Sequence, residues 1–199
     1  MKYPAGLLAC SLIALAAPLS AARAADALCA STDARTIAAA KRFAQAANAT
    51  TSLGEKNQLV SRTLAPRLQI DHVPANPADG PWGSKDIVRA MTVEAAMGPE
   101  IDAALAGAGL KDLSEETRAY ADGRCVVTVA IQHARGPEGE LISTGVSKFY
   151  LKGDRIVGLK SYRRPGFGPK YAAAAGAAMA SSKYRDQLMQ IRPPKAAQK

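Results

Sequence analysis

The sequence predicts an α+β fold in which helices come first and an antiparallel sheet follows. Before residue 110, apolar residues recur mainly at helical spacing, whereas residues 110–164 alternate apolar and polar side chains as strands do. Asp122-Gly123 and Lys152-Gly153-Asp154 interrupt the second half in the manner of hairpin turns. We therefore expect a cone-shaped, curved antiparallel sheet covered by N-terminal helices, with a further C-terminal helix.

The first 24 residues have the features of a cleavable secretion signal. A positive start at Lys2 precedes an apolar run over residues 7–17, and Ala22-Arg23-Ala24 supplies the small-residue pattern that signal peptidase reads. The run is too short to span a bilayer, which needs about 20 residues. We expect residues 1–24 to be a signal peptide, and the mature protein to be periplasmic or secreted.

Cap and stripe residues define the predicted helices. Ser31-Thr32-Asp33 is an N-cap cluster before an Ala-rich helix that runs to about Asn48, and a short helix follows over residues 55–62. Ser84 begins a helix that runs to about Met97. Gly98-Pro99 is expected to interrupt it before a further helical piece over residues 100–106.

Short alternating runs define the predicted strands. The first covers residues 68–73 and is followed by a Pro-, Gly- and Asn-rich loop over residues 74–83. Four more form a meander and cover residues 117–121, 125–134, 142–151 and 155–163. The expected organisation is one domain over residues 25–168. A C-terminal helix and a basic tail would follow over residues 169–199.

Removal of the signal leaves two cysteines, Cys29 and Cys125. In an oxidising compartment two cysteines favour a disulfide, which would staple the N-terminal segment to the sheet. The alternative is a pair of buried thiols, because a free cysteine behaves as a small hydrophobic residue. The sequence leaves both open.

The net charge of +9 is concentrated at the C-terminal end. Residues 152–199 hold eleven Lys and Arg against two Asp, while residues 25–151 hold thirteen against fifteen acidic residues. Such an end is typical of a solvated polar face, and it could also make weak contact with anionic surfaces. The basic residues are scattered and aromatics are few, so we expect no nucleic-acid partner.

Three motifs resemble the nuclear transport factor 2-like superfamily, in particular its SnoaL-like and limonene-epoxide-hydrolase-like branch. They are a helix start at residues 83–87, a strand start at Asp122-Gly123, and a closing hairpin over residues 149–162. The resemblance covers about residues 34–165. It implies a cone-shaped α+β barrel with a deep pocket, often dimeric through the sheet. Because this fold hosts isomerases, hydrolases, cyclases and binding modules, it does not fix a function.

The resemblance implies no intact family mechanism. Registered on Asp122-Gly123, the charged positions of the epoxide hydrolases fall on Val129, Ile131 and Ser161, which cannot activate water in those roles. In ketosteroid-isomerase relatives the general-base position falls near His72, while the oxyanion-donor position falls near Val146. A base is therefore retained without its matching acid.

Alternation along the strands places both histidines at the ends of apolar faces. His72 shares a face with Leu68 and Ile70, and His133 shares one with Cys125 and Val127. If both faces line the pocket, His72 is the candidate general base, because histidine exchanges protons near neutral pH. Each histidine could instead cap a core edge. The expected pocket-lining residues are Ile70, Trp82, Val127, Val129, Ile131, His133 and Ser161.

No metal site and no cofactor are predicted, because two histidines without clustered carboxylates do not make a ligand set, and phosphate-binding loops are absent from the sequence. Two functions remain. One is an exported domain that binds a small apolar molecule in the cone pocket. The other is a proton-transfer enzyme of the isomerase, dehydratase or cyclase type, with His72 as general base. The resemblance also allows a homodimer through the sheet in either case, and the sequence leaves the oligomeric state open.

Overall fold

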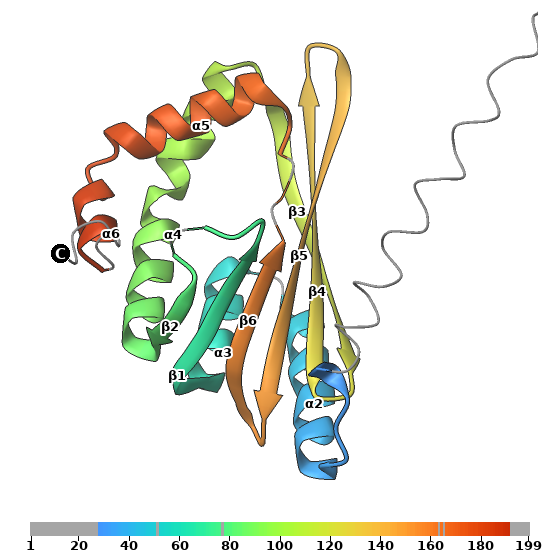
Figure 1. Ribbon diagram of the computed structural model, residues 1–199. Helices are drawn as coiled ribbons and strands as arrows, with labels where there is room; N and C mark the ends of the chain where they lie inside the picture. The colour runs from blue at the N-terminus through green and yellow to red at the C-terminus, as the bar shows by residue number, and fades with distance from the viewer. Residues whose placement is uncertain (1–27, 51, 77, 163, 165, 192–199) are drawn as a thin grey trace, which may run out of the picture.

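The computed structural model describes residues 28–50, 52–76, 78–162, 164 and 166–191 (Figure 1). The predicted signal peptide therefore lies outside the described residues. The elements, in chain order, are α2 (Ala34–Ala49), α3 (Leu53–Thr63), β1 (Leu64–Val73), β2 (Gly80–Gly83), α4 (Ser84–Gly107), β3 (Lys111–Asp122), β4 (Cys125–Gly136), β5 (Gly139–Lys152), β6 (Arg155–Tyr162), α5 (Pro169–Ser181) and α6 (Arg185–Ile191).

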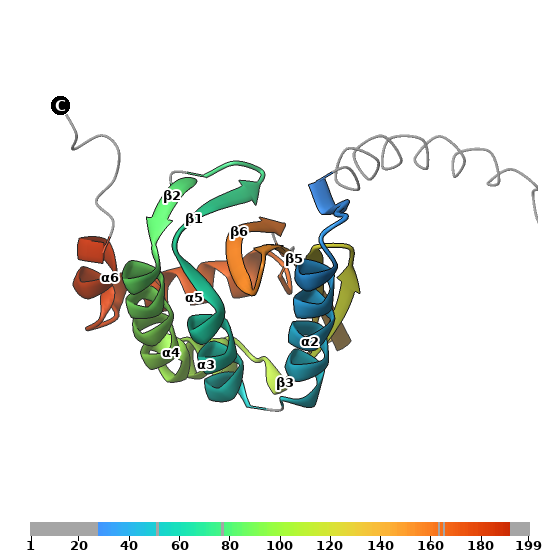
Figure 2. The same cartoon turned by 90° about the horizontal axis from the view of Figure 1, so that it is seen from below.

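The strands form one sheet in the order β2-β1-β6-β5-β4-β3. Consecutive strands from β3 to β6 pair antiparallel, so the predicted meander is confirmed. β1 pairs with β6 in parallel, and the sheet is therefore mixed rather than purely antiparallel. Parallel pairing requires a long connection between the two strands, and here α4 and the meander separate β1 from β6. Seen from below, the strands and helices surround a common centre (Figure 2). The α+β prediction is confirmed.

One face of the sheet, which we call the inner face, packs against α2, α3 and α4. Its core row runs across four strands in register: Ile70 of β1 is opposite Leu159, Leu159 is opposite Phe149, and Phe149 is opposite Val126. These side chains share one cluster with Ala40 and Phe43 of α2. The Phe43 and Phe149 rings are tilted, with centroids 5.7 Å apart. Apolar burial in this cluster fixes which face of each strand points inward.

Side-chain caps define where the first two helices begin. Asp33 accepts a hydrogen bond from the Arg35 amide at the start of α2, and Ser52 with Glu55 forms a capping box at the start of α3. At the end of α2, the Asn48 amide pairs with the Ala119 backbone, accepting at 2.7 Å and donating at 2.8 Å. It thus mimics a neighbouring strand and ties α2 to the edge strand β3.

A disulfide between Cys29 and Cys125 joins the N-terminal segment to β4. Both residues are buried. The Arg124 amide also donates to the Cys29 carbonyl at 2.9 Å. At Gly123, whose φ is +54°, a Cβ atom would lie 2.1 Å from that carbonyl, so the turn admits only glycine. In the chain-entropy account, a bridge that closes about 96 residues stabilises the fold by roughly 4–5 kcal/mol.

Three elements differ from the sequence prediction. α4 continues through Pro99 to Gly107, although an interruption at Gly98-Pro99 was expected. Proline removes one donor and crowds the preceding turn, but packing of α4 against α5 and α6 keeps the helix continuous. The predicted loop contains a short strand, β2, and the C-terminal helix is divided into α5 and α6.

α5 closes one end of the molecule. Its Tyr171 packs with Leu105 of α4, Leu110 and Ala134 in a second apolar cluster. The C-terminal helix therefore belongs to the same packed body as the sheet.

Within the described ranges, the helices do not reach the length and apolar character of a membrane span.

Candidate functional site

Beyond the core row, the inner face carries a polar row in register. His72 of β1 is opposite Ser161, Ser161 is opposite Ser147, and Ser147 is opposite Thr128. Each of these residues lies two positions along its strand from a core-row residue, so its side chain points to the inner face. The Ser147 hydroxyl lies 3.5 Å from the Ser161 hydroxyl. All four residues are partly exposed. This polar row is the candidate functional site.

His72 is held by a carboxylate. Its Nδ1 lies 2.6 Å from Oδ1 of Asp79, and the two side chains are 30% and 20% exposed. The hydrogen bond with His72 lowers the pKa of Asp79, so this carboxyl is ionised at neutral pH. An ionised carboxylate only accepts hydrogen bonds, and Nδ1 must therefore carry a proton. In the neutral ring Nε2 is then left with its lone pair, as a base requires.

The loop that carries Asp79 is ordered by its own polar groups. Asp79 Oδ2 accepts the Asn76 amide at 3.0 Å, and the Asn76 side chain accepts the Ala78 amide at 2.7 Å. Trp82 of β2 donates from its indole nitrogen to the Ala78 carbonyl at 2.8 Å, while its ring packs against the inner core. Asp79 was missed by the sequence analysis. The available signal was an acidic residue seven positions after His72 in a loop that had to turn back.

A second charged group lies on the inner face, farther along β5. Arg164 donates from Nη1 to Glu115 at 3.1 Å, and Gln132 donates to the same oxygen at 3.1 Å. A Cβ atom at Gly145 would lie 2.6 Å from Arg164 Nε, so the guanidinium rests directly on this glycine. Gly145 lies two residues from Ser147, about 7 Å along the strand. Arg164 therefore borders the polar row.

Glu94 of α4 projects from the helix face that carries Ile87 and Ile101, seven residues to either side. Its side chain is exposed, yet surrounding protein raises the pKa of its carboxyl by desolvation. The effect on stability is small, because solvent screens a charge that water reaches. Glu94 was not foreseen, because it interrupts the apolar stripe on which the helix was predicted.

The structure corrects the expected grouping of the pocket residues. Ile70, Trp82 and Ser161 lie on the inner face with His72. The remaining expected pocket residues alternate with the buried Val126 and therefore lie on the opposite, outer face: Val127, Val129, Ile131 and His133. His133 contacts Glu140 there, with Nδ1 at 3.3 Å from the carboxylate, and it is remote from the polar row. The two histidines do not share one surface.

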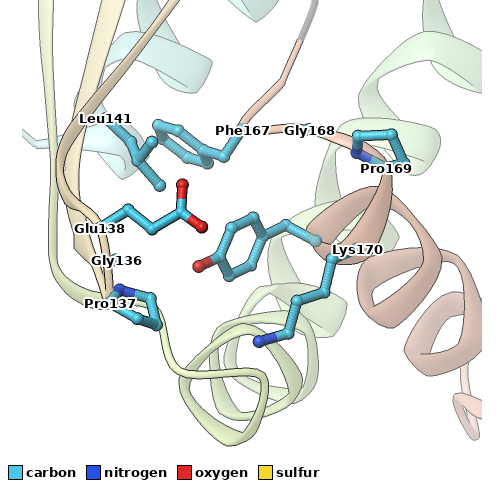
Figure 3. Close-up of a pocket in the computed structure, with 9 residues that line it drawn as sticks. Gly136, Pro137, Glu138, Leu141, Phe167, Gly168, Pro169 and Lys170 are labelled. Carbon is cyan, nitrogen blue, oxygen red and sulfur yellow. The ribbon is translucent and has the colours of Figure 1, made fainter.

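Among the described residues, no three His, Cys, Asp or Glu side chains gather closely enough to hold a metal ion. A hollow of about 350 Å³ lies away from His72, between the β4–β5 hairpin and the start of α5 (Figure 3). The inner face near His72 thus offers a base, three hydroxyl groups and a nearby guanidinium. This arrangement can accept a proton while it donates hydrogen bonds to an oxygen of a small molecule.

No family model and no curated protein matches the chain. Solved structures resemble it at low identity. PrhC from Penicillium brasilianum is 10% identical with a TM-score of 0.42, covering 80% of this chain and 97% of that one. An LEH-like epoxide hydrolase of M. tuberculosis is 16% identical, with a TM-score of 0.38 and coverages of 73% and 95%. BvnE pinacolase from Penicillium brevicompactum is 11% identical, with a TM-score of 0.40 and coverages of 74% and 95%.

A hypothetical protein with a ketosteroid-isomerase-like fold from Catenulispora acidiphila is 14% identical, with a TM-score of 0.34 and coverages of 67% and 89%. Identities and TM-scores of this size carry no information about chemistry. The chemistry of this protein is therefore inferred from its own residues.

Proposed function

We propose that this protein is an exported enzyme that transfers a proton on a small molecule, with His72 as the general base. The observation that carries the proposal is the contact of 2.6 Å between His72 Nδ1 and Asp79 on the inner face. A carboxylate behind an imidazole fixes its tautomer and orientation, and it stabilises the imidazolium that forms when the ring takes a proton.

The neighbours of His72 support a substrate with an oxygen next to the reacting carbon. Ser161, Ser147 and Thr128 extend from His72 as a line of hydroxyl groups across the sheet. Hydrogen bonds from such groups stabilise the negative charge that develops on a carbonyl oxygen when its α-proton is removed. Isomerisation, dehydration and cyclisation of a carbonyl compound can each begin with this step. The substrate is accordingly a small molecule with a carbonyl or hydroxyl group that meets the polar row.

Export is supported by the disulfide between Cys29 and Cys125, since disulfides persist in oxidising compartments. If the protein is exported as proposed, its mature form lacks residues 1–24, and the intact mass of periplasmic protein reports this directly. An unprocessed mass in the cytoplasm would contradict the export proposal. The homodimer that the family resemblance allows stays a prediction. The apolar outer face around Val127 and Val129 is where it would form.

The experiment is α-proton exchange in D2O, followed by NMR on small ketones such as cyclohexanone and acetophenone. General-base catalysis contributes roughly 10²- to 10⁴-fold, so His72→Asn should lower the catalysed rate by at least ~100-fold. His133→Asn is the matched control, because that imidazole also contacts a carboxylate but lies on the outer face. A rate that His72→Asn leaves unchanged, or a wild-type rate equal to that of buffer, would overturn the proposal.

A second candidate function is binding without turnover. It is favoured by one observation: the residues that follow His72 in the polar row are neutral serines and a threonine, so the row supplies no acid to complete a proton cycle. Native mass spectrometry of protein purified from its own periplasm separates the two. A carrier retains a stoichiometric ligand in both the wild type and His72→Asn and shows no exchange activity.

A further inference from the structure

The hollow near α5 is a separate feature from the polar row. Its walls come from the tip of the β4–β5 hairpin, with Gly136, Pro137, Glu138 and Leu141, and from the segment that begins α5, with Phe167 to Tyr171. Figure 3 shows Glu138, Leu141 and Phe167 arranged around it. Its volume is about 350 Å³, which lies in the range of small-molecule sites. None of its lining residues belongs to the polar row.

The first turn of α5 faces this hollow with free backbone donors. The helix begins at Pro169, and its N-cap Gly168 makes no side-chain hydrogen bond. The first backbone hydrogen bond of the helix runs from the Ala172 amide to the Gly168 carbonyl at 3.0 Å. The amides of Lys170 and Tyr171 precede it and lack an acceptor from the cap. Such amides, at the positive end of the helix dipole, favour an anion.

An independent observation comes from Tyr171. The residue is only 8% exposed, and its ring packs in the second apolar cluster. Its hydroxyl nevertheless reaches the hollow, where it lies 2.9 Å from the position of a Cβ atom at Gly136. Among the described residues, no side chain or backbone group forms a hydrogen bond with this hydroxyl, which faces the open space of the hollow. The ring is buried while the hydroxyl oxygen is open to the hollow, so its O–H is available to donate to a molecule bound there.

The charges around the hollow are not balanced evenly. Lys170 places its ammonium 5.5 Å from the centroid of the Tyr171 ring, beside the phenol. Glu138 is the only carboxylate among the lining residues, and it is exposed at the hairpin tip. The remaining walls are apolar: Pro137, Leu141, Phe167 and Pro169. One end therefore donates hydrogen bonds and carries positive charge, and the rest suits a hydrocarbon body.

We propose that this hollow binds a small amphiphilic carboxylate. The carboxylate group meets the first turn of α5, the Tyr171 hydroxyl and Lys170, while the apolar body lies against Phe167 and Leu141. Glu138 disfavours the anion from the opposite wall and sets a modest affinity. This site is independent of His72 and of the reaction proposed above.

The test uses the purified whole protein, 3-phenylpropionate as the probe and 3-phenylpropionamide as its neutral counterpart, in a ¹H–¹⁵N NMR titration. Saturable shifts are expected at the amides of Gly136, Leu141 and Lys170. The acid should bind at least ~5-fold more tightly than the amide, since charge-assisted hydrogen bonds are about twice as strong as neutral ones. Equal affinity for acid and amide, shifts at Ser147 and Thr128 instead, or no saturation by ~10 mM would overturn the proposal.

Variants with opposite expected signs sharpen the result. Tyr171→Phe keeps the packed ring and should weaken binding of the acid by roughly 10-fold or more, the cost of one charge-assisted hydrogen bond. Lys170→Gln should remove most of the preference for acid over amide, whereas Glu138→Gln should tighten the acid. Lys183→Gln is the matched control, because Lys183 also lies over a tyrosine ring, that of Tyr184, outside this hollow. A thermal melt of each variant reports whether it folds.

Discussion

The two histidines of the chain make a controlled comparison. Each contacts a carboxylate through Nδ1, at 2.6 Å for His72 with Asp79 and at 3.3 Å for His133 with Glu140. His72 points to the inner face beside three hydroxyl groups, while His133 points to the outer face beside an exposed partner. An imidazole with a carboxylate is thus not sufficient to indicate a site. The face of the sheet and the neighbours in register decide what the pair can do.

The largest expected difference between the two histidines is in catalysis. His72→Asn should lower α-proton exchange by at least ~100-fold, because the base is lost while the polar row remains. His133→Asn should leave the rate within about twofold of wild type. NMR exchange rates on the same ketone panel measure both. Equal losses for the two variants would mean that the faces do not differ in function.

Loss of the carboxylate partner should likewise lower the exchange rate on the inner face more than on the outer face. Asp79→Asn should lower the rate by roughly 10-fold or more, because an amide no longer enforces the tautomer with its proton on Nδ1. Glu140→Gln on the outer face should change the rate little. Both variants are read by the same exchange assay, with the fold checked by circular dichroism. An Asp79→Asn rate equal to wild type would show that His72 needs no orienting partner.

Removal of a hydroxyl group should show the same difference between the inner and outer faces, with a smaller effect on the exchange rate. Ser161→Ala removes the inner-face neighbour of His72 and should lower the exchange rate by about 5-fold, near the value of one neutral hydrogen bond. Thr144→Ala removes a hydroxyl that is opposite Ile131 on the outer face and should be silent. If Thr144→Ala matched Ser161→Ala, the effect would reflect sheet stability and not the site.

The smallest effect is a pH dependence of stability at Glu94, whose pKa is raised by desolvation. A raised carboxyl pKa means that the folded state holds the proton more tightly. The resulting stabilisation is present below the ordinary value of 4.5 and is lost as pH rises through the folded-state value. Glu94→Gln should therefore increase the free energy of unfolding at pH 7 by less than about 1 kcal/mol, seen as a higher Tm, and should leave Tm unchanged in acid. Thermal melts at both pH values measure this.

The pH dependence of stability at Asp79 should be opposite to that at Glu94, because the hydrogen bond with His72 lowers the pKa of Asp79. Its contribution to stability is present above the ordinary value of 3.8 and disappears as pH falls through the folded-state value. The stability difference between wild type and Asp79→Asn should thus narrow in strong acid. A difference that stays constant from pH 7 into acid would contradict the assigned pairing.

Alternation and turn residues were enough to predict the meander and the face on which His72 lies. They could not show which face of β4 points inward, because both of its faces carry apolar residues. Val127, Val129 and Ile131 are more hydrophobic than Thr128 and Ala130, yet it is Val126 that is fully buried. A period of two indicates that two faces exist, and packing against α2 decides which of them is covered.

The residues that contact the site, Asp79 and Arg164, could not be predicted from the sequence for a different reason. Asp79 reaches His72 only because the loop after β1 turns back, held by Asn76 and Trp82. Arg164 lies on Gly145 and contacts Glu115, which is distant in sequence. These contacts depend on loop paths and on strand order, including the parallel pairing of β1 with β6, and residue spacing records neither.

The tautomer of His72 tests the central claim most directly. Long-range ¹H–¹⁵N correlation NMR distinguishes a protonated ring nitrogen from one with a lone pair, at a pH where the ring is neutral. We expect Nδ1 of His72 to carry the proton and Nε2 to be unprotonated, and we expect this preference to be lost in Asp79→Asn. A proton found on Nε2 in the wild type, with Nδ1 as the bare nitrogen, would contradict the assignment of His72 as a base held by Asp79.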